Sequence, residues 1–150
     1  AVAAALDAVE LAPYRKRTLS CLSGGERRRA LIASVLAQQP EILLLDEPTS
    51  SLDIHHAIAL MRLLSDFGPD GPAVVIVTHD INLAALFGRR LLLLVEGRIA
   101  ADGPPEDVVR RDAMQRAYGA DVLVREHPET GGPMIVARRS PPPEGSVQHA

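Results

Sequence analysis

The sequence contains very few of the residues on which several common kinds of site depend. Aromatic residues make up 3% of the chain and tryptophan is absent, so the core must be aliphatic. The single cysteine, Cys21, excludes an intramolecular disulfide and a cysteine-based metal cluster. Lys16 is the only lysine and lies outside any glycine-rich loop, so a phosphate site that depends on lysine has one candidate.

Two further features are missing: an excess of basic residues and a long apolar run. The 16 basic and 19 acidic side chains give a net charge of −3, which argues against a general electrostatic grip on nucleic acid. The longest aliphatic runs, such as 91–95, are far shorter than the ~20 residues that a membrane helix needs. Asp7 and Glu10 interrupt an apolar start that has no basic leader, which makes it a poor signal peptide.

The composition is nevertheless that of a folded chain. Hydrophobic residues make up 47% of the 150 residues, which argues against a mainly disordered chain. A chain of this size can bury about 68–70% of its extended surface, and it corresponds to one domain or to one piece of a larger one. Because the sequence begins without a methionine, we expect an upstream portion to be missing.

The order of apolar runs and turn residues predicts alternating helices and strands. Residues 41–47, 73–77 and 91–95 are short aliphatic runs typical of strands that are buried on both faces. The expected order predicts an α/β fold with a mainly parallel sheet flanked by helices. Helices are expected at 1–12, 23–39, 54–66, 81–87 and 105–118, hairpins at 91–101 and 122–138, and a disordered tail at 140–150. The expected inward stripe of the third helix is Ile54, Ile58, Met61 and Leu64.

The first candidate site is the segment Leu22-Ser23-Gly24-Gly25-Glu26, which opens a predicted helix. Glycines allow a backbone to approach an anion closely, and a helix N-terminus offers unpaired N–H groups. The spacing of Ser23 and Glu26 also fits a simple capping box, which is common in helices that bind nothing. Both interpretations stay open on this segment alone.

The second candidate is the acidic pair Asp46 and Glu47, which follows the strand Ile42-Leu43-Leu44-Leu45. Ligands of open α/β sheets bind at the carboxyl ends of strands. Carboxylates there suit Mg²⁺, and Glu47 could accept a proton from an attacking water. The alternative is that the two acids merely end a strand and favour the next helix start.

The third candidate is His79, which comes two residues after a buried strand and beside Asp80. An imidazole placed near a phosphate can hydrogen-bond a phosphoryl group during its transfer. A lone histidine is more often an ordinary loop residue, and His55 and His56 are expected to be solvated or to pack locally. The order and spacing of all three candidates make purely structural explanations improbable together.

This constellation resembles the second half of the ATP-binding domain of ABC transporters. The matching segments are Leu22–Glu26 with the family signature, Ile42–Glu47 with the Walker B strand, Ser51-Leu52-Asp53 with the D-loop, and His79 with the switch histidine. The likeness covers about residues 1–139. It divides the chain into the C-terminal portion of a P-loop NTPase domain (1–118), a terminal hairpin (119–139) and the tail (140–150).

The resemblance implies a role for each matched residue. Asp46 would bind Mg²⁺ through water, Glu47 would polarise the hydrolytic water, and His79 would contact the γ-phosphate of ATP. The signature residues would reach the ATP held by the opposite subunit of a homodimer, and Asp53 would lie at that dimer interface; these signature residues are Ser23, Gly24, Gly25 and Glu26. The family also implies a transmembrane permease, an indirect link to a substrate-binding protein, no nucleic acid, and a position on the cytoplasmic face of the membrane.

The sequence departs from the family pattern in three places. Arg28 stands where glutamine is frequent and Ser51 where alanine is frequent, and both changes look tolerable. More seriously, no G-x-x-x-x-G-K-[ST] segment occurs, and that loop supplies much of the positioning in phosphoryl transfer. We therefore expect a C-terminal portion of a longer protein that alone binds ATP poorly and hydrolyses it negligibly.

The cargo and the wider class are predicted from smaller details. The segments around Asn82 and Pro105 are similar to those of importers of iron complexes, hemin and cobalamin, and the segment 118–133 favours hemin slightly over ferric siderophores. The alternatives are an ABC-type ATPase of DNA repair, or a non-catalytic module that offers its 23–26 face to an intact partner.

Overall fold

The computed structural model describes residues 1–50, 52–68, 71–119 and 122–139. These residues form two compact units, one within residues 1–79 and one within residues 80–139, and each unit has its own core. The predicted tail at 140–150 lies outside the described residues, as does Ser51. The predicted mixture of helices and strands is confirmed in both units.

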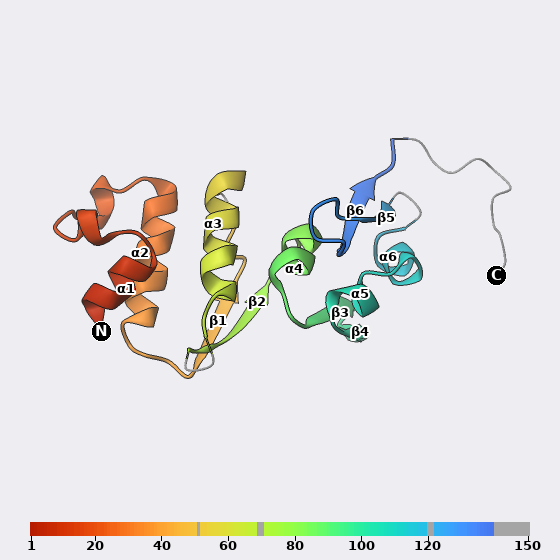
Figure 1. The fold of residues 1–150 in the computed structure, drawn as a ribbon, viewed down its shortest axis with the longest axis horizontal. Coiled ribbons are helices and arrows are strands. Elements are labelled where there is room, and N and C mark those ends of the chain that lie inside the picture. Colours follow the sequence, from red (N-terminus) through yellow and green to blue (C-terminus); the bar gives the residue numbers. More distant parts are fainter. Residues whose placement is uncertain (51, 69–70, 120–121, 140–150) are drawn as a thin grey trace, which may run out of the picture. The chain divides into compact units, whose positions relative to one another are not determined.

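The first unit combines three α-helices with one pair of strands (Figure 1). Its helices are α1 (Val2–Ala8), α2 (Gly24–Leu36) and α3 (Ile54–Ser65), with short 3-10 turns η1 (Ala12–Tyr14) and η2 (Leu19–Cys21) between α1 and α2. Strands β1 (Ile42–Asp46) and β2 (Ala73–Val77) pair in parallel, with Asp46 opposite Val77. This register brings the carboxyl ends of both strands to the same edge.

The core of the first unit lies on one face of the β1–β2 pair. Leu43 is 1% exposed and Leu60 of α3 is completely buried, and both pack with residues of α1 and α2. The opposite face is open: Leu44 is 72% exposed, and Ile42, Val75 and Val77 are exposed too. The prediction that these strands are buried on both faces is therefore wrong for this chain, because helices of the unit cover one face only.

Helix α3 buries a different stripe from the predicted one. Ile54 is exposed and Ile58 is half-buried, whereas Met61 and Leu64 are buried as expected. The buried set is Ala57, Leu60, Met61 and Leu64. These positions follow the i, i+3, i+4, i+7 spacing of one helix face, and that face leaves the first helical residue outside the core.

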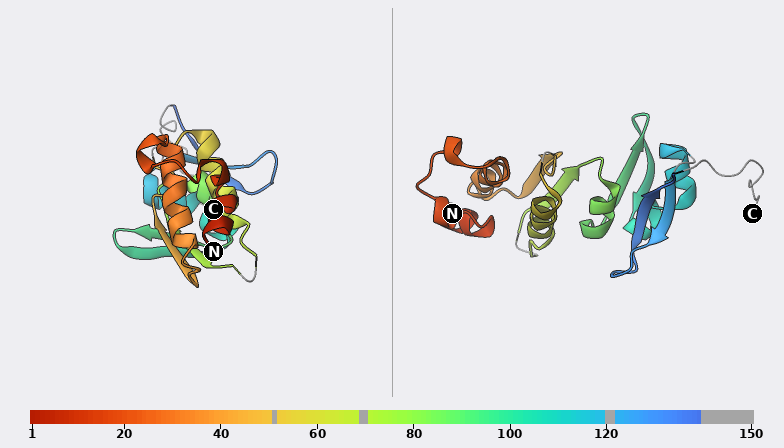
Figure 2. Two further views of the ribbon diagram at one scale, coloured as in Figure 1. Left: turned by 90° about the vertical axis from the view of Figure 1, so that its left-hand side faces the viewer. Right: turned by 90° about the horizontal axis from the view of Figure 1, so that it is seen from above.

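The second unit is built from two antiparallel hairpins and three helices (Figure 2). Its elements are α4 (Ile81–Phe87), β3 (Leu91–Val95), β4 (Arg98–Gly103), α5 (Pro105–Val108), α6 (Arg111–Tyr118), β5 (Val122–Glu126) and β6 (Pro133–Ala137). The hairpins β3–β4 and β5–β6 confirm the two predicted hairpins. The described strands thus form three two-stranded sheets, of which the β1–β2 pair is parallel.

The helix predicted at 105–118 is divided in two. Arg110 has extended backbone angles (φ −102°, ψ 154°) and separates α5 from α6. The break allows Val109, which is 2% exposed, to pack in one cluster with Met114 of α6. Burial of these two side chains explains a break that the helical pattern of the sequence did not predict.

Candidate functional site

Asp46 and Glu47 lie at the carboxyl end of β1, where the chain leaves the parallel pair. The Glu47 N–H donates to the carbonyl oxygen of Val77, at the end of β2, over 2.8 Å. Glu47 Oε1 accepts a hydrogen bond from the backbone N–H of His79 (3.0 Å) and lies 2.8 Å from His79 Nδ1. The parallel register thus joins two predicted site residues that are far apart in the sequence.

The Glu47–His79 pair is too exposed to be a major source of stability. The side chains are 33% and 83% exposed, and such surface ion pairs contribute about 0–1 kcal/mol. Glu47 also has a positive φ of 46°, which costs a residue with a side chain about 1–2 kcal/mol. A strained backbone with little gain in stability is typical of a functional position.

The second carboxylate oxygen of Glu47, Oε2, is in a different environment from Oε1. Oε2 is buried and accepts no hydrogen bond from the described residues. A buried acceptor without a partner normally binds water or a ligand. One oxygen of Glu47 is therefore oriented by His79, whereas the other has no hydrogen-bond partner among the described residues.

Arg28 is a member of this site that the sequence motifs do not predict. From the second turn of α2, its guanidinium donates to the carbonyl oxygens of Asp46, Glu47 and Pro48. By its sequence alone, this arginine is only a tolerable departure from the family pattern. The signal that could have identified Arg28 is its position in the sequence. A long cationic side chain five residues after Ser23 can reach the end of a neighbouring strand.

The signature segment forms the capping box that the sequence left as one alternative. Glu26 Oε2 accepts from the Ser23 N–H over 2.7 Å, and Ser23 Oγ accepts from the Glu26 N–H over 3.3 Å. The hydrogen bond from the Ser23 N–H lowers the pKa of Glu26 below its ordinary value. A Cβ added at Gly24 would meet no atom within 4 Å, so the backbone remains open at this helix start.

Asp53 caps α3 and brings the start of that helix next to the signature segment. Its carboxylate accepts from the His56 N–H over 2.9 Å and lies 2.7 Å from His56 Nδ1. These contacts lower the pKa of Asp53, the His56 N–H having the largest effect. A Cβ at Gly25 would lie 3.6 Å from the His56 ring and from Leu52, so the two helix starts adjoin. His56 is thus a packing residue, as predicted.

The described residues include no group of three or more side chains able to hold a metal ion by themselves. Asp46 is an exposed carboxylate at the strand end and immediately precedes Glu47 in the sequence. Mg²⁺ is normally bound by one or two carboxylates together with phosphate oxygens and water. The donor set therefore fits a magnesium ion that arrives with a nucleotide.

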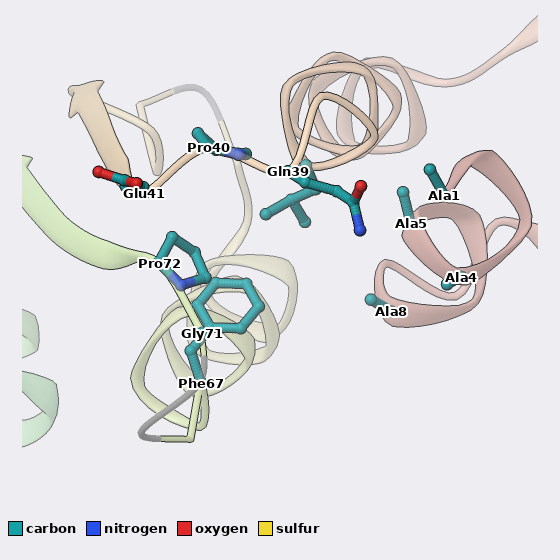
Figure 3. A pocket seen from close by; sticks show the side chains of 11 residues that line it. Ala1, Ala4, Ala5, Ala8, Gln39, Pro40, Glu41, Phe67, Gly71 and Pro72 are labelled. Carbon is teal, nitrogen blue, oxygen red and sulfur yellow. The ribbon is translucent and has the colours of Figure 1, made fainter.

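A cavity of about 470 Å³ lies elsewhere in the first unit (Figure 3). Alanines of α1, Phe67 and Pro72 line it, and its polar side chains are Gln39 and Glu41. None of the predicted site residues is in its lining. Its chemistry is mainly apolar, so this cavity does not form part of the candidate site.

Comparison with known proteins shows which proteins this chain is similar to. Residues 1–50 match the ABC transporter family model. Two relatives are named hemin import ATP-binding protein HmuV. That of Rhodococcus jostii is 45% identical over 139 residues (93% of this chain, 48% of the relative), and that of Streptomyces coelicolor is 46% identical over 141 (94% and 50%). The chain spans about half the length of the curated relatives it matches.

Solved structures show the same relationship. A metal-chelate type ABC transporter in an inward-facing conformation matches 91% of this chain and 55% of its own, with a TM-score of 0.79 and 26% identity. CbiO1 from Clostridium perfringens, part of the cbiONQ transporter complex, matches 77% of this chain and 46% of its own, with a TM-score of 0.68 and 33% identity.

The fold is therefore that of the ABC ATPase domains, a class of P-loop NTPase. The first 50 residues match the ABC transporter family model, and the two curated relatives, of which the chain spans about half, are named hemin import ATP-binding proteins. Among the helices of the described residues, none combines the length and the apolar character needed to span a bilayer.

Proposed function

We propose that the chain is part of the ATP-hydrolysing subunit of an ABC importer for hemin or another iron complex. The Glu47–His79 pair at the edge of two parallel strands carries this proposal. It joins a carboxylate that can take a proton from water to an imidazole that can donate to a phosphoryl oxygen. The names of the relatives support the importer over an ATPase of DNA repair.

Each predicted site residue at the carboxyl ends of β1 and β2 has a defined role in this proposal. Glu47 polarises the attacking water, a role supported by its partly exposed carboxylate at the strand end. His79 contacts the γ-phosphate, a role supported by its 83% exposure beside Glu47. Asp46 binds Mg²⁺ through water, and the ion would neutralise charge on the transferring phosphate.

The signature segment serves a second nucleotide. Ser23, Gly24 and Gly25 contact the ATP of an identical opposite subunit, with Glu26 holding Ser23 in place. The open backbone at Gly24 and the positive end of the α2 dipole support this role. Asp53 lies at the same dimer interface, because the start of α3 adjoins Gly25.

The remaining partners follow from the importer class. Closure of the ATPase dimer drives a transmembrane permease, to which a substrate-binding protein delivers the cargo. The subunit is peripheral on the cytoplasmic face of the membrane. The shared name of the relatives favours hemin as cargo over ferric siderophores or cobalamin, although the cargo itself does not contact this subunit.

The test uses a chimera in which this chain replaces the matching segment of the Rhodococcus jostii relative, together with its permease. We expect ATP hydrolysis and hemin uptake by the unchanged chimera. Glu47→Gln should lower kcat by about 10²–10⁴-fold, the usual contribution of a general base, with ATP binding retained. Glu41→Gln is the control, because Glu41 immediately precedes the opposite end of β1.

Three results would contradict the proposal. Undiminished turnover in the Glu47→Gln chimera would remove the role of Glu47. Failure of the unchanged chimera to bind or hydrolyse ATP would remove the assignment to the ATPase subunit. Uptake of a ferric siderophore or of cobalamin without uptake of hemin would correct the cargo alone.

A further inference from the structure

Arg28 connects α2 to the strand end that carries Asp46 and Glu47. Its Nε donates to the Pro48 carbonyl oxygen over 3.2 Å, and its Nη2 is shared between the carbonyl oxygens of Asp46 (3.5 Å) and Glu47. One side chain thus holds three consecutive peptide units. These contacts are directed at backbone oxygens rather than at a carboxylate, so they fix the path of the chain.

The backbone that Arg28 holds is the strained one. Glu47 adopts a left-handed conformation (φ 46°), and Pro48 next to it is buried. The Glu47 N–H is fixed on Val77 O, and the Glu47 carbonyl also accepts from the N–H (3.1 Å) and Oγ (2.8 Å) of Ser50. Several hydrogen-bond donors around the Glu47 carbonyl thus stabilise a left-handed backbone conformation that is unfavourable by itself.

The direction of the Glu47 side chain depends on this backbone conformation. In the left-handed region the Cα–Cβ bond points differently from its direction in an extended strand. Here Oε1 lies 3.0 Å from the backbone nitrogen of His79 and 2.8 Å from its Nδ1. A return of Glu47 to ordinary strand angles would move its carboxylate away from these donors.

The forked guanidinium is the feature that suits this task. It presents several N–H groups in one plane, so a single side chain can bind neighbouring carbonyls at once. A lysine ammonium would keep the charge but would act as a single point donor. An aliphatic side chain of similar length would fill the space and donate nothing.

We propose that Arg28 is a positioning residue that locks the backbone of Asp46, Glu47 and Pro48 and thereby holds the Glu47 carboxylate against His79. This inference rests on the proposed function only for its effect on catalysis. The geometric part concerns the 150-residue chain itself. The two parts can therefore fail separately.

The geometric part is tested by NMR on the isotope-labelled chain. The His79 amide and imidazole signals report the contacts with Glu47 Oε1. In Arg28→Met we expect the His79 amide to exchange about tenfold faster and the imidazole nitrogen shifts to move, whereas Arg28→Lys should show a smaller change of the same kind. Arg27→Met is the matched control, because Arg27 donates to the carbonyl of Leu22 instead, and its His79 signals should equal those of the unchanged chain.

The geometric part is overturned if the His79 signals of Arg28→Met match those of the unchanged chain, or if Arg27→Met shifts them equally. If Arg28→Met loses the dispersed amide spectrum of a folded chain, Arg28→Lys decides the question. Unchanged His79 signals in a folded Arg28→Lys chain would overturn the need for a forked donor.

The catalytic part is tested in the chimeric ATPase. Arg28→Met should lower kcat by about 10–100-fold, as expected for a misplaced catalytic group, with KM for ATP changed less than about twofold. In a Glu47→Gln background the same substitution should cause no further loss, because Arg28 acts through Glu47. A merely structural role would give additive losses and would overturn the catalytic part. If the unchanged chimera is inactive, the proposed function fails, and the NMR result on Arg28 still stands.

Discussion

Removal of the Asn82 side chain should loosen the attachment of β6 to α4 in the second unit. Asn82 Nδ2 donates to the Ile135 carbonyl oxygen over 3.1 Å, and Asn82 Oδ1 accepts from the Ile135 N–H over 2.8 Å. The amide therefore acts as a neighbouring strand would, on the side of β6 that faces away from β5. Removal of the Asn82 side chain breaks both of these hydrogen bonds.

The size of the effect follows from these two hydrogen bonds. A neutral hydrogen bond contributes about 0.5–1.5 kcal/mol, and both lie at an exposed position where water competes for the same groups. We therefore expect Asn82→Ala to cost the second unit about 1–2 kcal/mol. Because 1.4 kcal/mol is a factor of ten, the Ile135 amide should exchange about 5–30 times faster.

Hydrogen exchange followed by NMR measures this directly at one amide. Asn82→Asp is the control, since it keeps an oxygen that accepts from the Ile135 N–H and loses the donor to the Ile135 carbonyl. Its Ile135 amide should stay better protected than in Asn82→Ala. Equal exchange of Ile135 in the unchanged chain and in Asn82→Ala would refute the reasoning, because the N–H would then be protected by something else.

Three further predictions concern the first unit. Gly24→Ala should raise the free energy of unfolding by about 0.4–1 kcal/mol, because the added methyl group meets no atom within 4 Å. The same substitution should weaken ATP hydrolysis in the chimera. A decrease in both stability and ATP hydrolysis would show that the backbone at Gly24 is not open. Leu60→Ala should cost about 2–5 kcal/mol in urea unfolding, since Leu60 is completely buried, and a cost below about 1 kcal/mol would contradict its place in the core. The pKa values of Glu26 and Asp53 are lowered in the folded state. Their contribution to stability is therefore present above the unfolded pKa and is lost as the pH falls through the folded pKa. Circular dichroism should show a loss of helix below about pH 4, and Glu26→Gln should make this loss smaller.

Features set by neighbours in the sequence were predicted well. The two hairpins and the Ser23–Glu26 capping box, which was one of two alternatives for that segment, each depend on residues that are close along the chain. Local spacing is enough for these, because capping and turn formation involve side chains three to five positions apart. The fold class and the similarity to ABC transporter proteins followed from the order of such local patterns.

Features set by contacts across the chain needed the structure. The stripe of α3 and the open face of β1 depend on which other elements cover them, and the hydrophobic pattern alone cannot supply this information.

The sequence by itself determined that a carboxylate ends one strand and a histidine follows the next. Only the tertiary structure decided that Glu47 Oε1 lies 2.8 Å from His79 Nδ1 and that Arg28 binds the backbone carbonyls of Glu47 and Pro48. The physical reason is that strand register and a left-handed backbone angle set these distances. Both are fixed by hydrogen bonds between residues about 20 to 32 positions apart in the chain.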